Sequence, residues 1–198
     1  IAFDSETTSL SPREGHMFCI QIGTGENNYL IDFQKLGGEI TFEEVIPYIK
    51  DKTLVGHNLT FDLGWLYKHN FVPNKVYDTF IASKLLYNGD HFVKRHAFGF
   101  VMERELGLSY DKSEQKNIAK TQLSNYKAIQ YSFNDVDKVL ELVKAMATKL
   151  KENGMIETFK LHCRYIRALA YMEQCGIPVS VSKWKEKIEQ DRINLEER

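Results

Sequence analysis

The sequence predicts an α/β domain in which a mixed β-sheet is flanked by helices, with a helical extension at the C-terminal end. Three observations favour this class. Short apolar segments rich in β-prone residues come first, strands then alternate with helices, and a long segment of helical periodicity follows. The 198 residues are 43% hydrophobic and 27% charged, which is ordinary for a globular domain.

The first strands are predicted to form a meander. Residues 1–3 are apolar and β-prone, and residues 17–23 and 28–32 are two further strands joined by a turn at 25–27. Two short strands follow, at 53–56 and at 76–77. The predicted helices between and after these strands cover residues 42–50, 59–69, 78–87 and 97–106.

A single long helix is predicted from about residue 124 to residue 154. Its apolar residues recur at alternating spacings of four and three: Ile129, Phe133, Val136, Leu140, Val143, Ala147 and Leu150. Asp135 lies in a neighbouring row that is mostly apolar. Because an unpaired buried carboxylate is costly, we expect Asp135 to face a pocket or a cationic partner.

The remaining residues predict a helical extension. Residues 159–175 have a helical pattern, a Gly-Ile-Pro sequence at 176–178 interrupts it, and a highly charged helix follows. We therefore expect two parts, a domain over residues 1–154 and an extension over residues 155–198. Since the chain starts with Ile1 inside a strand, we expect it to be a fragment of a longer protein.

Composition argues against several classes of function. No apolar run approaches the length that spans a membrane, so we expect no membrane association. Cys19, Cys163 and Cys175 are too few and too scattered for a disulfide framework or a zinc site, which favours a reducing cytoplasm. The net charge of −1 provides no general attraction for nucleic acid, so such binding would depend on metal ions and local contacts.

Asp4 and Glu6 are the first candidate site. They follow the first strand two residues apart, so their side chains point to the same face. Neighbouring carboxylates repel each other unless one binds a proton or a cation lies between them, and paired hard oxygen ligands suit Mg²⁺ or Mn²⁺. Taken alone, however, the pair is more typical of two solvated acids in a loop, because acids are common and mostly exposed.

Two further pairs have the same ambiguity. Asn58 is predicted to cap the helix after the fourth strand, and Asp62 lies in its first turn, where a negative charge is favoured. Either residue could be purely structural. Tyr131 and Asp135 are four residues apart and therefore share a helix face. The same spacing is compatible with a purely structural pair, an aromatic side chain packed beside a hydrogen-bonded acid in the core.

In this order, the three pairs resemble the three motifs of the DnaQ-like 3′–5′ exonuclease superfamily, in its tyrosine-containing (DEDDy) branch. The matching stretches are FDSETTSL at 3–10, VGHNLTFDLGWL at 55–66 and YSFNDVDKVLEL at 131–142. The resemblance covers nearly all of residues 1–150. It implies a ribonuclease H-like fold, with a mixed five-stranded sheet that has helices on both sides.

The resemblance also implies the roles of the matching residues. Four carboxylates would hold two divalent metal ions, Mg²⁺ or Mn²⁺, and a tyrosine would position the attacking water; these catalytic residues are Asp4, Glu6, Asp62, Asp135 and Tyr131. Leu10 would pack on the terminal base of the substrate, and Thr7, Asn58 and Phe61 would line the same groove.

Two relatives within the superfamily fit different parts of the chain. Residues 108–136 are similar to ribonuclease D, which processes RNA 3′ ends. Residues 169–188, LAYMEQCGIPVSVSKWKEKI, are similar to the junction between the exonuclease domain and the thumb of family A DNA polymerases. We favour the polymerase, which implies a monomeric bacterial or phage proofreading domain that acts on single-stranded or frayed DNA 3′ ends beside the polymerase domain of its parent chain. An inactive nucleic-acid-binding scaffold is the alternative of another class.

Overall fold

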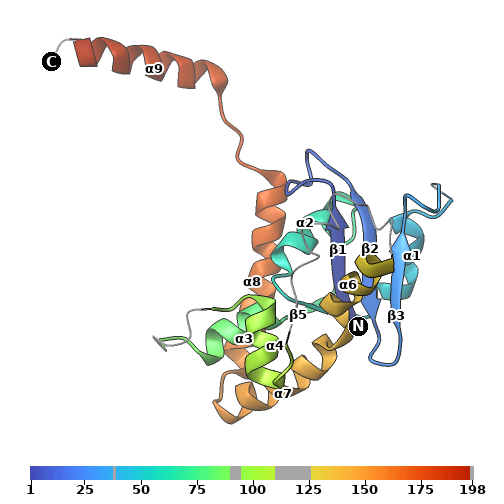
Figure 1. The fold of residues 1–198 in the computed structure, drawn as a ribbon. Coiled ribbons are helices and arrows are strands. Elements are labelled where there is room, and N and C mark those ends of the chain that lie inside the picture. The colour runs from blue at the N-terminus through green and yellow to red at the C-terminus, as the bar shows by residue number, and fades with distance from the viewer. Residues whose placement is uncertain (38, 90–94, 110–125, 197–198) are drawn as a thin grey trace.

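The computed structural model describes residues 1–37, 39–89, 95–109 and 126–196, with backbone alone for residues 126–131. Its centre is a five-stranded mixed sheet in the order β3-β2-β1-β4-β5 (Figure 1). The strands are β1 (Ala2–Thr7), β2 (Met17–Gly23), β3 (Asn28–Asp32), β4 (Thr53–Gly56) and β5 (Lys75–Asp78). The first three pair antiparallel as a meander, whereas β4 is parallel to β1 and β5 is parallel to β4. The predicted class is confirmed.

Helices pack on the sheet and on one another. Their bounds are α1 (Phe42–Ile49), α2 (Thr60–Lys68), α3 (Thr79–Leu86), α4 (Phe98–Leu106), α6 (Tyr126–Asp137), α7 (Val139–Glu152), α8 (Ile156–Cys175) and α9 (Val181–Glu196). Helix α6 packs on β1, β2 and β3, while α8 packs on α2 and β5. The central strands and α2 supply much of the core, including the fully buried Phe3, Ile20, Leu54 and Trp65.

The single long helix predicted over residues 124–154 is wrong. Lys138 has a φ of −100° and a ψ of 6°, outside the helical range, and it separates α6 from α7. The break allows each helix to bury its own apolar face, α6 on the meander and α7 on α3 and α4. The sequence pattern could not reveal this break, because the spacing of the apolar residues continues unchanged from α6 into α7.

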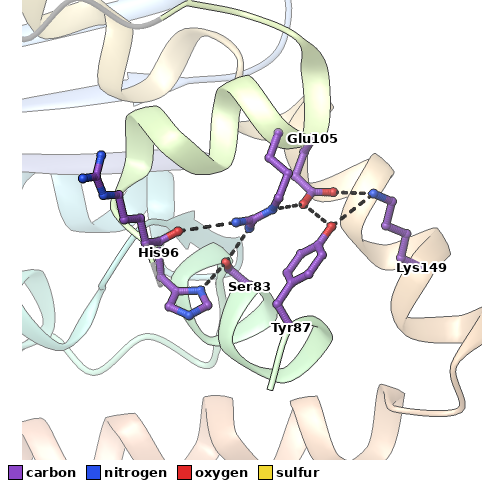
Figure 2. A network of polar contacts seen from close by, with 7 residues as sticks. Ser83, Tyr87, His96, Glu105 and Lys149 are labelled. Carbon is purple, nitrogen blue, oxygen red and sulfur yellow. Dashed lines mark hydrogen bonds and ion pairs between the residues drawn. The ribbon is translucent and has the colours of Figure 1, made fainter. Parts of the chain in front are cut away.

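A polar network joins the three helices α3, α4 and α7. Glu105 of α4 has a fully buried side chain and accepts hydrogen bonds from Arg104, from Tyr87 just after α3 and from Lys149 of α7, at 2.9, 2.7 and 2.8 Å (Figure 2). Arg104 also donates to Ser83, which in turn contacts His96. The network ties α7, and thereby the end of α6, to the rest of the domain.

The C-terminal extension has two different halves. Helix α8 is anchored in the core by Phe159, Cys163, Ile166 and Ala170, whereas α9 contains no buried residue and extends away from the domain (Figure 1). Within the described part of the chain, no helix combines the length and apolar character needed to cross a bilayer. The division into domains at residue 154 stays a prediction. Most of the stretch similar to ribonuclease D falls on residues 110–125, outside the described residues.

Candidate active site

Three of the predicted acids converge at the end of β1. Asp4, Glu6 and Asp135 each offer a carboxylate oxygen, and these three oxygens lie within 4.8 Å of one another. Asp4 and Glu6 share a face because strand side chains alternate, and Asp135 reaches them from α6, which covers that face of the meander. Residues far apart in the sequence thus form one group of possible metal ligands.

Asp62 lies beside this group, although it is not one of the three converging acids. It is the third residue of α2, is only 4% exposed, and accepts a hydrogen bond of 2.6 Å from the Ser5 hydroxyl. Its charge nevertheless helps to raise the pKa of Asp4, so the two carboxyl groups interact. The sequence did not single out Ser5, because a serine between two acids has no distinctive pattern.

The acids raise one another's pKa values. Burial, followed by the charges of Asp62, Asp135 and Glu6, raises the pKa of Asp4 well above its ordinary range. Burial and the same kind of repulsion raise the pKa of Glu6 to about 7, and burial raises the pKa of Asp62 to about 7. Among the described residues, no lysine or arginine forms an ion pair with Asp4, Glu6 or Asp62. The site therefore favours protons or added cations.

The turn that leads into α2 is built differently from the prediction. Asn58 does not cap the helix, because Leu59 occupies that position and Asn58 has a φ of +65°. Instead, the buried Asp78 accepts hydrogen bonds of 2.9 Å from the backbone N–H groups of Asn58 and Leu59. Asp78 also caps α3, where its side chain accepts a hydrogen bond from the backbone N–H of Phe80. Its second role in orienting the start of α2, and hence Asp62, is visible only in the tertiary structure.

The predicted substrate contacts Leu10 and Phe61 lie together. Both line a hollow of about 240 Å³ between the loop after β1, the start of α2 and the end of α8. Leu10 is 88% exposed, which leaves its side chain available for contact. Thr7 donates to the backbone carbonyl of Ser9 at the start of this loop, and Asn58 is exposed. The four predicted contact residues thus lie close in sequence to the acids: Thr7 and Leu10 follow Glu6, and Asn58 and Phe61 precede Asp62.

Two cations that sequence reasoning missed hold the loop that carries Leu10. Lys68 of α2 donates to the carbonyls of Pro12 and Gly15, at 2.7 and 2.5 Å. Arg13 donates to the carbonyl of Gln174 at the end of α8, at 2.8 Å. Gly176 lies against the Arg13 guanidinium and has a φ of +70°, a backbone conformation that favours glycine. The loop is therefore tied to both α2 and α8.

Tyr131 lies in α6, four residues before Asp135. This spacing places the two residues on the same side of the helix, as predicted. The side chain of Tyr131 lies outside the described residues, so its predicted role in positioning water stays a prediction.

The donor set fits a hard divalent cation. Carboxylate oxygens from three separate sequence positions meet without a basic partner for Asp4 or Glu6 among the described residues, and such ligands suit Mg²⁺ or Mn²⁺. Together, the order of the mixed sheet and its likeness to Escherichia coli RNase D define the class of fold as ribonuclease H-like, with a group of acids at the end of β1 that could hold a divalent metal ion.

Comparison with known proteins identifies the family. Residues 1–151 match the model of the 3′–5′ exonuclease domain found in family A DNA polymerases. The match covers more than half of the chain, and the chain therefore belongs to this 3′–5′ exonuclease family, as the order of its motifs predicted. The family implies phosphodiester hydrolysis.

A curated relative and two solved structures agree with this family. DNA polymerase I of Aquifex aeolicus is 30% identical over 93% of this chain and 33% of that protein, so the chain spans about a third of its length. The structure of Brucella melitensis NrnC with bound Mg²⁺ has a TM-score of 0.76 at 22% identity, covering 88% of this chain and 85% of that one. Escherichia coli RNase D has a TM-score of 0.73 at 20% identity, covering 86% and 44%. These two structures support the fold.

Proposed function

We propose that this domain removes nucleotides from DNA 3′ ends in a reaction that depends on two divalent metal ions, Mg²⁺ or Mn²⁺, as the proofreading exonuclease of a family A DNA polymerase. The convergence of Asp4, Glu6 and Asp135 supports the metal requirement. The similarity to a DNA polymerase I over 93% of the chain supports DNA as the substrate.

Each side chain of the site has a defined task in this proposal. Asp4, Glu6, Asp62 and Asp135 hold the cations, and Tyr131 positions the attacking water by a hydrogen bond. The bound cations supply the positive charge that phosphodiester hydrolysis requires and lower the pKa of water. Leu10 and Phe61 contact unpaired bases in the hollow that they line, with Thr7 and Asn58 beside the path of the strand.

The metal requirement is tested with a uniformly labelled single-stranded DNA oligonucleotide. We expect 5′-mononucleotides to be released in Mg²⁺ or Mn²⁺ and the reaction to stop in EDTA. Asp135→Asn should lower kcat by about two to three orders of magnitude, because it weakens the main electrostatic stabilisation, and Tyr131→Phe should lower it less. The exposed Asp137 is the matched control, since Asp137→Asn changes the same helix outside the acidic group.

The results of this experiment separate an enzyme from a scaffold. Full activity in EDTA would refute the metal requirement. An absence of cleavage by a folded protein that also binds no Mn²⁺ would favour the nucleic-acid-binding scaffold.

The choice between DNA and RNA requires a second comparison. Single-stranded DNA and RNA of one sequence are digested side by side in Mg²⁺ across a range of enzyme concentrations. The ribose 2′-hydroxyl is the group by which such a site distinguishes RNA from DNA. We expect DNA to be preferred, because the groove near Thr7 and Leu10 should be shaped for the absence of that hydroxyl. A clear preference for RNA, above all for structured 3′ tails, would replace the proposal with a ribonuclease D-like function.

Proofreading is tested with duplexes that differ only in the terminal base pair. The exposed Leu10 can contact a terminal base only when that base is unpaired, and fraying of a matched pair has a free-energy cost. A mismatched 3′ end should therefore be removed faster than a matched one in single-turnover reactions. Equal rates, with chemistry limiting, would argue against proofreading.

A further inference from the structure

Gln21 lies beside the acidic site, although no catalytic motif contains it. It is in the middle of β2, is fully buried, and pairs directly with Asp4 of β1. Directly opposed residues of an antiparallel pair have their side chains on the same face of the sheet. Gln21 therefore lies on the face that carries Asp4 and Glu6, the face that α6 covers.

The amide of Gln21 is in an unusual state for a buried polar group. Among the described residues, neither its nitrogen nor its oxygen has a hydrogen-bond partner, and both atoms are inaccessible to solvent. The Gln21 amide lowers the pKa of Glu6 and so opposes the rise in that pKa that burial and the neighbouring acids cause. The amide thus lies close to the Glu6 carboxylate without the geometry of a hydrogen bond.

A buried amide without a partner lowers folding stability, whereas an apolar residue of similar size would not. The other residues of β2, MFCIQIG, are apolar or glycine, so Gln21 is the one amide of a strand that otherwise suits the core. Polar groups that break a local rule in this way occur at functional sites. An ionised carboxylate accepts hydrogen bonds only, and the amide nitrogen of Gln21 is a donor close to one.

We propose that Gln21 is a positioning residue of the active site, whose amide nitrogen donates a hydrogen bond to the Glu6 carboxylate when Glu6 serves as a metal ligand. The inference rests on the proposed metal-dependent function. With one oxygen of Glu6 held by the amide, the other is directed toward the cation. Such partners of ligating carboxylates orient the ligand and increase the affinity for the metal.

The test measures metal affinity and stability separately in the whole chain. Gln21→Met and Gln21→Leu remove the amide and keep an apolar side chain. Calorimetric titration with Mn²⁺, without nucleic acid, should show that Kd rises about 10- to 100-fold. The Tm in EDTA should be equal to or higher than that of the unmodified protein, because a buried group without a partner has been removed. Ile20→Met, on the same strand and the opposite face, is the control and should leave the Kd unchanged.

The outcomes distinguish this inference from the proposed function. If the unmodified protein binds no Mn²⁺, the proposed function fails and the role of Gln21 fails with it. If the unmodified protein binds Mn²⁺ and both variants bind it equally well, only the role of Gln21 is refuted. A fall in Tm with unchanged Kd, or the failure of both variants to fold, would show that the amide serves the fold and would also overturn the inference.

Discussion

Glu6→Gln should make the metal-free protein more stable at alkaline pH, although it removes a proposed metal ligand. Burial, with the charges of Asp135 and Asp62, raises the pKa of Glu6 from its ordinary 4.5 to about 7. Each pKa unit corresponds to 1.36 kcal/mol, so the ionised Glu6 carboxylate costs the folded state about 3 kcal/mol above pH 7. Glutamine has nearly the same shape and carries no charge.

The sign of the effect follows from proton linkage. Because the folded-state pKa of Glu6 lies above its unfolded value, its contribution to stability is fully present below about pH 4.5 and is lost as the pH rises through about 7. The difference between Glu6→Gln and the unmodified protein should therefore be near zero at pH 4.5 and about 3 kcal/mol at pH 8. For a chain of 198 residues, this corresponds to a Tm increase of roughly 6–12 °C.

The assay is thermal and urea unfolding in EDTA at a series of pH values, followed by circular dichroism. Glu26→Gln, at an exposed turn between β2 and β3, is the matched control and should leave the stability unchanged. Added Mn²⁺ should stabilise the unmodified protein more than Glu6→Gln, because the variant has lost a ligand charge. A Glu6→Gln protein that is less stable than the unmodified one at pH 8 in EDTA would refute the reasoning.

Three further substitutions test the contacts around the site. Ser5→Ala should lower the free energy of unfolding by about 1–3 kcal/mol, because it leaves a buried oxygen of Asp62 without its donor; urea unfolding checks this, with Ser5→Thr as control. Arg13→Gln should release the loop after β1 from α8 and raise KM for single-stranded DNA at unchanged kcat, so a fall in kcat alone would contradict it. Burial favours protonation of Glu105, but hydrogen bonds, first from Lys149, outweigh it and lower its pKa. Glu105→Gln should therefore cost about 1.5–3 kcal/mol at pH 7, and the difference should vanish as the pH falls through the lowered pKa; an equal loss at pH 3 and pH 7 would argue against this.

The sequence by itself determined the class of fold and predicted the three acids that the structure brings together. Alternating or continuous apolar runs predicted the strands, because strand formation depends on a short local pattern. The spacing of Asp4 and Glu6 placed them on one face for the same reason, and the position of Asp62 near a helix start followed from the local pattern too. Motif order then predicted the family that the comparisons identified.

Only the tertiary structure decided how these parts meet. The approach of Asp135 to β1 depends on the packing of α6 on the meander, and the break at Lys138 depends on the different surfaces that α6 and α7 bury. Asp78 orients the start of α2 through the turn at the end of β4, and Gln21 faces Asp4 through the register of β1 with β2. Each of these contacts joins positions that are distant in the chain, and no local periodicity encodes a pairing that packing alone establishes.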